Sequence, residues 1–174
     1  MQEPKQPIAI YDSGVGGLSI AAAIHEELPH EDLLYIADNL HAPYGNKGAD
    51  FIYQRAHAIA VFARKHKAKA LVIACNTATA LAVNRLRANF SMPIIAIEPA
   101  IKPACAIDPL GPIAILATEG TLNSDRFLEL KNEHALNQEI ICQACTGLAE
   151  SIEKGPSNSE QIEFYLEKYL TPIK

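Results

Sequence analysis

Apolar residues along this chain occur in short continuous runs that are separated by longer stretches with helical periodicity. Six runs are strand candidates, at residues 7–11, 32–38, 70–74, 93–97, 112–118 and 139–144. They are continuous rather than alternating, which is typical of parallel strands buried on both faces. Strand–helix alternation over this length predicts an α/β fold with a doubly wound, open parallel sheet and right-handed crossovers.

Two of the intervening stretches are clear helix candidates. The first covers residues 49–66, and one largely apolar stripe of it consists of Phe51, Arg55, Ala58, Ile59 and Phe62. Basic residues follow near its C-terminal end, where the helix dipole favours cations. The second covers residues 161–170, after a loop rich in Gly, Pro and Ser at 153–161.

The chain also shows a division into two parts near Glu98–Pro99. Strand ends followed by Ser or Thr occur in DSG near the start and again in ATEGT at residues 117–121. We therefore expect two similar α/β domains, at residues 1–98 and 99–174.

Composition and charge narrow the class of protein. The chain has 174 residues, of which 49% are apolar and 20% charged, and its formal net charge is -5. Without a basic cluster, we expect no nucleic-acid partner. No apolar run approaches the roughly 20 residues of a membrane span. The polar start MQEPKQP has no apolar segment of a signal peptide, so we expect a cytoplasmic protein with reduced thiols.

Ligands of open α/β sheets bind outside the carboxyl ends of the strands, so the loops there are the first candidates. Asp12 and Ser13 follow the first strand in YDSGVGGLS, and the glycines after them allow close approach of a ligand. The spacing fails the G-x-G-x-x-G dinucleotide pattern, with Asp38 the only candidate for a ribose carboxylate, and the phosphate-loop lysine is absent. Either a tight strand–helix turn or an anion site fits this loop.

A second loop, ADNLHAPYGNKG at residues 37–48, follows the second strand. Pro43 fixes the chain there, whereas Gly45 and Gly48 permit unusual backbone angles. Tyr44 and the backbone N–H of Gly45 can face a ligand, and an ordinary surface turn fits equally well.

The third loop contains Cys75, at the carboxyl end of the strand in ALVIACNTATALAVNRL. Asn76 or Thr77 can cap the next helix, and a thiol at a helix N-terminus has a lowered pKa because the dipole stabilises the thiolate. The alternative is a small apolar residue in the core. We favour the functional interpretation because the position is where this fold places its sites.

The other three cysteines give weaker indications of a functional role. Cys142 and Cys145 form a CxxC pair, but no second CxxC or paired histidines accompany it, so we expect no metal site. We expect Cys142 in the core, Cys145 near the strand end and Cys105 in helix packing. A hydrolase with Cys75 as nucleophile needs a histidine base, for which His57 is the available candidate.

Together the loops DSGVGGLS, PYG after an acidic AD, and ACNTATA resemble those of bacterial glutamate racemases. IEPAIKPA (97–104), ILATEGTLNS (115–124) and QACTGLAESIEKG (143–155) resemble the next motifs of that family, in the same order. The resemblance covers essentially the whole chain. Aspartate racemases are close in chemistry, but their N-terminal loop differs from DSGVGGLS, so glutamate is favoured.

The resemblance implies conversion of L- to D-glutamate without a cofactor, in the cytoplasm, for peptidoglycan synthesis and hence cell shape. Two thiols on opposite faces of the substrate exchange a proton with its α-carbon. Cys75 resembles one of them, assisted by Asp12, and Glu153 resembles the acidic residue that supports the other. The residues that resemble the family's substrate-binding positions are Asp12, Ser13, Tyr44, Gly45, Asn76, Thr77, Thr118 and Thr121.

One departure from the family pattern is large. The second catalytic cysteine of the family lies in a Gly-Cys-Thr-His stretch, and Cys145-Thr146-Gly147 has glycine where the histidine belongs. The resemblance therefore implies a chain truncated before that motif, with an incomplete second domain and little racemase activity alone. We expect exposed apolar surface to promote homodimers. The alternative is a non-catalytic remnant that binds glutamate.

Overall fold

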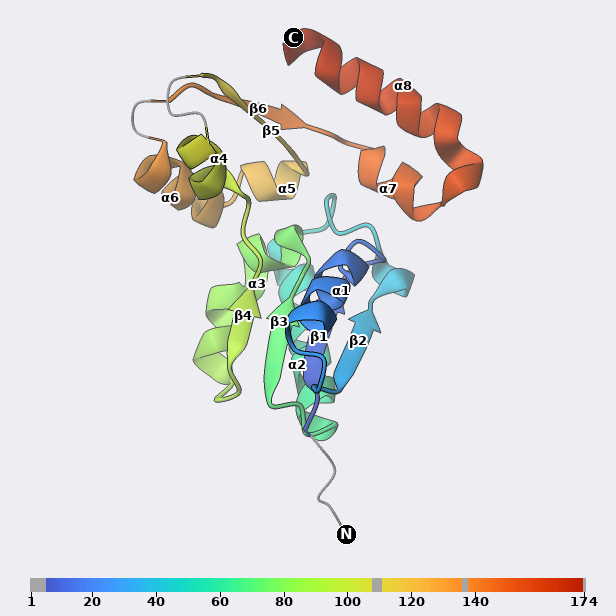
Figure 1. Cartoon of the computed structure of the whole chain (residues 1–174), viewed down its shortest axis with the longest axis vertical. Coiled ribbons are helices and arrows are strands. Elements are labelled where there is room, and N and C mark those ends of the chain that lie inside the picture. Colours follow the sequence, from blue (N-terminus) through green and yellow to red (C-terminus); the bar gives the residue numbers. More distant parts are fainter. Residues whose placement is uncertain (1–5, 108–110, 136–137, 174) are drawn as a thin grey trace. The chain divides into compact units, whose positions relative to one another are not determined.

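The computed structural model describes residues 6–107, 111–135 and 138–173, which contain alternating strands and helices (Figure 1). The chain divides into two compact units, which we call unit 1 (residues 1–98) and unit 2 (residues 99–174). All strand pairs in both units are parallel among the described residues. The α/β fold class with parallel sheets that the apolar runs predicted is confirmed.

Unit 1 contains a four-stranded sheet in the order β2-β1-β3-β4. The strands are β1 (Ile8–Asp12), β2 (Leu33–Ala37), β3 (Ala70–Ile73) and β4 (Ile94–Ala96). Every residue of β1 is buried, because the strand lies inside the sheet between β2 and β3. The chain leaves β1 toward β2 on one side and then crosses to β3 on the other. This reversal of direction, between β1 and β3, is the point where open α/β sheets bind their ligands.

Helices cover both faces of this sheet. Helix α1 (Leu18–Glu27) packs on the face formed by Ile8, Ile10 and Val72, and α2 (Ala49–Lys65) and α3 (Asn76–Asn89) pack on the other face, against Tyr11 and Ile73. The alternation of strand side chains between the two faces explains why the strands are apolar throughout. The short 3-10 helix η1 (Asn39–His41) follows β2, and the Ala42–Pro43 peptide bond after it is cis.

The buried stripe of α2 differs from the predicted one. Its buried residues are Ile52, Ala56, Ile59, Ala60 and Ala63. Only Ile59 belongs to the predicted stripe, and Phe62 is 43% exposed. Three of the five buried residues are alanines, which let the helix lie close to its neighbours, whereas the larger phenylalanines lie outside the contact. The predicted stripe contained the large apolar side chains, whereas the helix packs against the sheet through its small ones.

Unit 2 contains two parallel strands, β5 (Ile113–Ala117) and β6 (Ile140–Ala144). Its helices are α4 (Ile101–Ile107), α5 (Glu119–Leu122), α6 (Asp125–His134), α7 (Leu148–Glu153) and α8 (Ser159–Leu170), with 3-10 turns η2 (Pro156–Asn158) and η3 (Thr171–Ile173). Ile101, Phe127 and Leu130 form its core, and Cys105 packs against them as predicted. Exposed and half-buried residues alternate along β5. The apolar run predicted a strand buried on both faces, and this prediction is wrong for the described residues.

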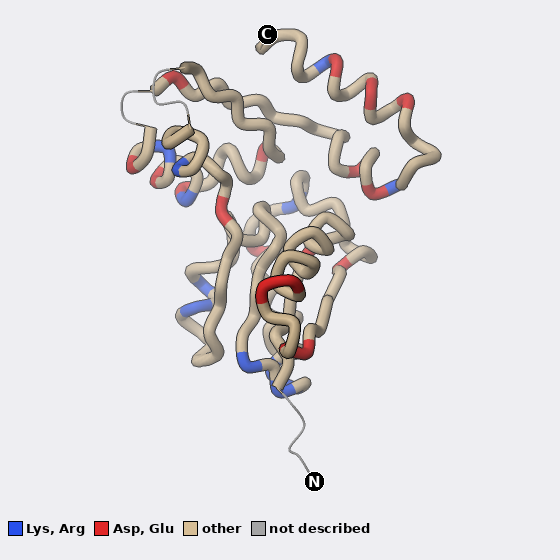
Figure 2. The backbone as a smooth tube through the Cα atoms, in the orientation of Figure 1, with Lys and Arg blue, Asp and Glu red and all other residues tan. Residues whose placement is uncertain are grey.

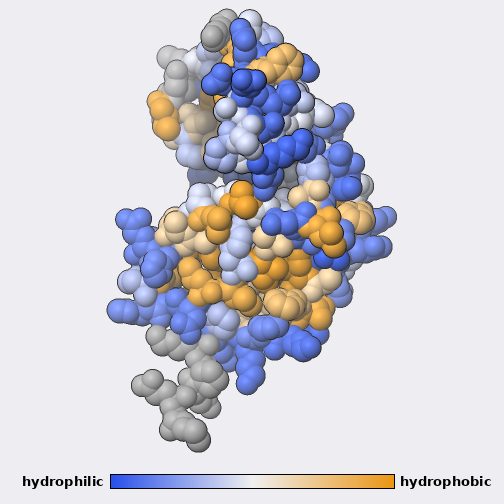
Figure 3. Space-filling model, turned by 90° about the vertical axis from the view of Figure 1, so that its right-hand side faces the viewer, coloured by the Kyte–Doolittle hydropathy of each residue, from blue (hydrophilic) through white to orange (hydrophobic). Residues whose placement is uncertain are grey.

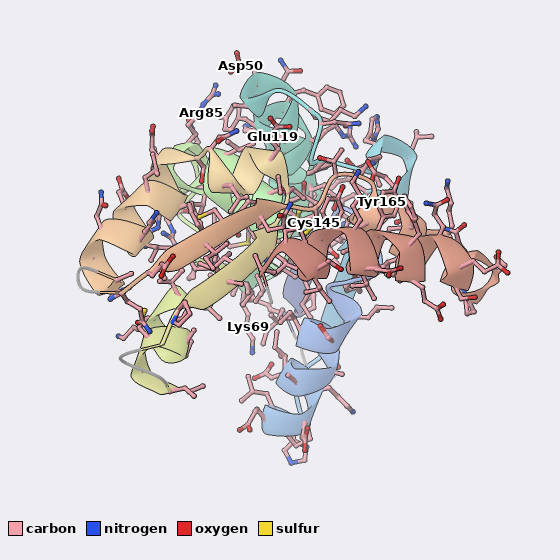
Figure 4. All side chains as sticks on the ribbon, turned by 90° about the horizontal axis from the view of Figure 1, so that it is seen from above. Asp50, Lys69, Arg85, Glu119, Cys145 and Tyr165 are labelled. Atoms are coloured by element: carbon pink, nitrogen blue, oxygen red, sulfur yellow. The ribbon has the colours of Figure 1, made fainter. Side chains whose placement is uncertain are left out.

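Two tyrosines of α8 contact the loop between β6 and α7. The backbone of Gly147 has φ +88°, and a Cβ there would lie 2.5 Å from the Tyr165 hydroxyl. Tyr169 donates a hydrogen bond to the carbonyl of Thr146 at 2.5 Å. Figure 4 labels Tyr165 and Cys145, which stands two residues before Gly147. Glycine is therefore required at position 147 by both its backbone conformation and its neighbour.

The surface of each unit carries a mixed charge. Basic residues stand at the C-terminal end of α2 and just before β3, and acidic residues recur along α8 (Figure 2). Figure 3 shows apolar side chains exposed on one face of the molecule. Leu18 and Leu28, at the two ends of α1, are among the exposed apolar residues of unit 1. Within the described ranges, no helix has the length and apolar character to cross a membrane.

Candidate active site around Cys75

Cys75 lies between β3 and α3, at the carboxyl edge of the unit 1 sheet. It is the N-cap residue of α3, and its sulfur accepts a hydrogen bond from the backbone N–H of Ala78 at 3.4 Å. The predicted cap, Asn76 or Thr77, is wrong, because both belong to the helix itself. Asn76 is exposed beside Cys75, whereas Thr77 is buried.

The side chain of Ser13 reaches the thiol from the neighbouring strand. Tyr11 of β1 pairs with Ile73 of β3, so the residues that follow these two strands come together. The hydroxyl oxygen of Ser13 lies 3.5 Å from the sulfur of Cys75. The structure therefore brings together two of the residues that the sequence nominated, at the reversal point of the sheet.

Asp12 organises the glycine-rich loop beside them. Its carboxylate is buried and accepts hydrogen bonds from the backbone N–H of Ser13 at 2.9 Å and of Gly17 at 2.6 Å. A Cβ on Gly17 would lie 2.8 Å from the Cβ of Asp12, so this close approach requires glycine. Asp12 thus fixes the loop that presents Ser13 to the thiol.

The thiol of Cys75 is held in its neutral form. Cys75 is 7% exposed. Burial raises its pKa above the ordinary range; the hydrogen bonds from Ser13 and Ala78 act in the opposite direction, and the charge of Asp12 raises it further. The helix N-terminus lowers this pKa through the N–H of Ala78, as expected, but the net shift is upward. The N–H donor is present, but the loss of water around the sulfur outweighs it.

Tyr44 belongs to a buried hydrogen-bonded group, which we call the Asp38 cluster and which consists of Tyr11, Asp38, His41, Tyr44 and Arg55. Tyr44 is 2% exposed. Its hydroxyl accepts a hydrogen bond from the Tyr11 hydroxyl at 2.7 Å and donates one to Asp38 Oδ2 at 2.6 Å. Its side chain therefore faces the protein interior, and the half-buried backbone of Gly45 follows it.

The other contacts of Asp38 come from η1 and α2. Arg55 donates from Nε to Oδ2 and from Nη2 to Oδ1, each at 2.9 Å, and His41 Nδ1 lies 2.9 Å from Oδ1. Burial alone would raise the pKa of Asp38, but the hydrogen bonds from Arg55, Tyr44 and His41 outweigh it and hold the pKa below its usual value. Burial raises the pKa of both Tyr11 and Tyr44. The cluster therefore holds one carboxylate and two neutral phenols.

The sequence did not identify this cluster, although one signal pointed to it. Asp38 directly follows β2, at the same edge of the sheet as Asp12 and Cys75. An acidic residue at that edge is a candidate on position alone. Its partner Arg55, in contrast, lies on a helix and was assigned to a packing stripe.

The remaining predicted residues belong to unit 2. Thr118 caps α5 by accepting the backbone N–H of Thr121 at 3.3 Å, and the hydroxyl oxygens of Thr118 and Thr121 lie 3.0 Å apart. Glu153 is the exposed last residue of α7. Cys145 is buried, and burial raises the pKa of its thiol. Cys142 is exposed, so its predicted place in the core is wrong.

Two other kinds of site find little support in these contacts. His57 lies against Phe90 and Tyr53, with ring centroids 5.2 and 5.8 Å away, so nothing indicates that it serves as a base for Cys75. Where the chain is described, no group of three or more His, Cys, Asp or Glu side chains is placed to hold a metal ion.

A doubly wound sheet with a thiol, a hydroxyl and a carboxylate at its reversal point is typical of the open-sheet α/β proteins, which bind their ligands at the strand ends. The sequence profile of the Asp/Glu/Hydantoin racemases matches residues 18–169. The chain belongs to this racemase family, which confirms the resemblance drawn from its loops.

Individual relatives agree with that assignment. A glutamate racemase from Methylococcus capsulatus is 46% identical over 168 residues, which cover 97% of this chain and 62% of the relative. The crystal structure of Escherichia coli glutamate racemase in complex with L-glutamate and the activator UDP-MurNAc-ala has a TM-score of 0.83 at 32% identity, covering 96% of this chain and 65% of that one.

A third comparison concerns the other enantiomer. The crystal structure of the Francisella tularensis glutamate racemase in complex with D-glutamate has a TM-score of 0.80 at 30% identity, and covers 96% of this chain and 63% of that protein. The chain thus spans a little under two thirds of the length of the relatives described here.

Proposed function

We propose that this chain takes part in the cofactor-independent interconversion of L- and D-glutamate, with Cys75 as one of two acid/base thiols. The observation that carries the proposal is the placement of the Cys75 sulfur at the reversal point of the sheet, 3.5 Å from the Ser13 hydroxyl and 3.4 Å from the Ala78 nitrogen. Relatives crystallised with L-glutamate and with D-glutamate support the substrate class.

The chemistry requires a base on one face of the α-carbon and an acid on the other. Because burial holds Cys75 neutral, its ground state suits the role of proton donor. To act as the base, Cys75 must first lose its proton, and the resulting thiolate keeps the hydrogen bonds from Ser13 and Ala78. Oriented donors of this kind stabilise charge without the cost of reorganisation.

In the proposal, the substrate contacts of unit 1 come from the loops at the ends of its strands. Asp12 meets the ammonium group, and Ser13, Asn76 and Thr77 bind carboxylate oxygens together with the backbone N–H of Gly45. Tyr44 contributes through the loop that it anchors. For unit 2, the family resemblance assigns carboxylate binding to Thr118 and Thr121 and support of the second thiol to Glu153. The product supplies peptidoglycan synthesis in the cytoplasm.

We further propose that these 174 residues alone have little racemase activity. Stereoinversion needs two thiols, and the family motif for the second is not matched by Cys145-Thr146-Gly147. A homodimer is also part of the proposal, since Leu18 and Leu28 are exposed in unit 1. Light scattering that gives a monodisperse monomer would contradict the dimer.

The deciding experiment incubates L- and D-glutamate separately with the chain in D2O and follows the α-proton by NMR. We expect slow exchange of one enantiomer without inversion, abolished by Cys75→Ala. Inversion of both enantiomers would show that a second acid/base group is present. Exchange that persists in Cys75→Ala would overturn the role of this thiol.

The alternative function is glutamate binding without proton exchange. The neutral state of the buried Cys75 thiol favours it, because a neutral thiol abstracts no proton. Line broadening or saturation transfer of glutamate signals, together with an unchanged α-proton signal, would support this alternative.

A further inference from the structure

We propose that Asp38 and Arg55 are positioning residues of the candidate active site, which fix the loop at residues 42–48 through the buried hydroxyl of Tyr44. This role in catalysis rests on the proposed function, whereas the contacts themselves lie wholly within unit 1. Within this loop, Tyr44 is the one residue that is buried. Its hydrogen bonds therefore decide where the loop backbone lies.

The hydroxyl of Tyr44 is occupied by protein partners. A phenol has one hydrogen to donate, and Tyr44 donates it to Asp38 Oδ2 at 2.6 Å while it accepts the hydrogen of Tyr11 at 2.7 Å. The protons thus run from Tyr11 to Tyr44 to Asp38. With both hydrogens committed in that direction, neither phenol donates to the sulfur of Cys75, and the cluster acts on the site through position.

Arg55 determines the orientation of the carboxylate that receives these protons. It contacts both oxygens of Asp38 at 2.9 Å, in the planar two-pronged geometry that only a guanidinium provides. His41 also contacts Oδ1, so each oxygen has two partners. A carboxylate has about four acceptor positions, and all are used here. Asp38 therefore has no freedom to rotate away from Tyr44.

The cluster also reaches the thiol through packing. Tyr11, Tyr44 and Cys75 belong to one buried group of side chains. Tyr11 directly precedes Asp12 and Ser13, which contact the glycine loop and the sulfur. A single network thus connects the end of β2, helix α2 and the loop at 42–48 with the strand that presents Ser13. Loss of Asp38 or Arg55 should release the loop and leave the sheet in place.

Amide hydrogen exchange on the full chain tests this role without a ligand. We expect exchange at residues 42–48 to rise about tenfold or more in Asp38→Asn and Arg55→Met, because each removes a charged hydrogen bond. Exchange in β1 and β3 should stay unchanged. Arg55→Lys keeps the charge without the two-pronged contact. Its amide exchange at residues 42–48 should be faster than in the wild type and slower than in Arg55→Met.

The matched control is Arg85→Met, which breaks an exposed ion pair between Arg85 of α3 and Asp50 of α2, the helix that also carries Arg55 (Figure 4). It should leave exchange at 42–48 unchanged. If Asp38→Asn fails to fold, Tyr44→Phe tests the same link, since it removes only the hydroxyl and should also release the loop. Unchanged exchange at 42–48, or an equal rise throughout unit 1, would overturn the proposal.

Glutamate titrations of the same proteins separate this inference from the proposed function. If the wild type binds glutamate, we expect a roughly tenfold weaker Kd in Asp38→Asn and Arg55→Met, and no change in Arg85→Met. Unchanged affinity in both variants would overturn the role in the site. If the wild type binds no glutamate, the proposed function fails, and the hydrogen-exchange result still decides whether the cluster positions the loop.

Discussion

The hydroxyl oxygen of Ser13 lies 3.5 Å from the sulfur of Cys75, although the two residues are 62 positions apart in the chain. The contact exists because β1 and β3 are adjacent and in register, so that their carboxyl ends meet. The pKa of the thiol is therefore lowered, against the effect of burial, by a residue that follows a different strand. Substitutions in the first loop should change the chemistry of a residue in the third.

Removal of the Ser13 hydroxyl should make Cys75 harder to ionise. In Ser13→Ala the thiolate loses a donor that lowers its pKa, so the pKa rises further and alkylation at neutral pH slows. The measurement is the pH profile of iodoacetamide labelling, followed by mass spectrometry of the peptide with Cys75. The exposed Cys142 is the internal control. A profile that is unchanged or shifted to lower pH would contradict this role of Ser13.

Neutralisation of Asp12 should make Cys75 easier to ionise. The negative charge of Asp12 raises the pKa of the thiol, so Asp12→Asn should lower that pKa and speed labelling of Cys75 at neutral pH. The same labelling experiment gives the answer, with circular dichroism to verify that the glycine loop keeps the fold. Slower labelling in a folded Asp12→Asn protein would show that the carboxylate favours the thiolate.

The glycine loop should tolerate a methyl group at one position and not at the next. A Cβ at Gly17 would lie 2.8 Å from the Cβ of Asp12 and 2.9 Å from that of Ala74, so Gly17→Ala should destabilise the fold by about 1–3 kcal/mol. At Gly16 the nearest atom is Asp12 Oδ2, at 3.4 Å, and Gly16→Ala should stay within about 0.5 kcal/mol. Urea unfolding measures both, and equal losses would refute the steric explanation.

In unit 2, Gly147 and Tyr165 should be coupled. Gly147→Ala places a methyl group 2.5 Å from the tyrosine hydroxyl, in addition to the cost of a left-handed backbone. Tyr165→Leu should relieve the steric share, with a coupling of about 1 kcal/mol or more in a double-mutant cycle. The cycle of Gly155→Ala with Tyr165→Leu is the control, because no heavy atom lies within 4 Å of a Cβ at Gly155. Equal coupling in both cycles would rule out the contact.

Asp38 should make unit 1 sensitive to acid. Its pKa is lowered on folding, so its contribution to stability is complete above the ordinary value of about 4 and is lost as the pH falls through the folded value. The stability gap between wild type and Asp38→Asn should therefore stay constant above about pH 5 and narrow as the pH falls below about 4. Asp50→Asn, which removes an exposed partner of Arg85, should show a much smaller change. The midpoints of urea unfolding, measured for the wild type and both variants as a function of pH, test this prediction.

The strands and their boundaries could be predicted because parallel strands covered on both faces appear in the sequence as continuous apolar runs. The run at 32–38 became β2 at 33–37, and the run at 93–97 became β4 at 94–96. The structure also places Ser13 and Cys75, two candidates chosen for their position at strand ends, in contact. Both successes depend on one rule, that this fold gathers the carboxyl ends of its strands at one edge.

The failures concern properties that depend on several elements at once. The cap of α3 is the sulfur of Cys75, which is an unusual acceptor there, so the pattern favoured Asn76 or Thr77. The net shift of the Cys75 pKa is upward, although the helix terminus lowers it as expected, because helix termini are visible in a sequence and the extent of burial is not. The pairing of Asp38 with Arg55 joins a strand end to a helix, and only the packed sheet reveals it.

The order of the strands also has a consequence for biosynthesis. β1 is made first, yet it pairs with β2 and with β3, which the ribosome adds much later. At about 5–20 residues per second, the apolar segment Ile8–Asp12 waits several seconds for residues 70–73. Until then the edge of β1 that pairs with β3 has no partner strand, and unpaired strand edges are prone to aggregate. A nascent chain stalled before residue 70 should therefore be the form of this protein that chaperones bind most strongly.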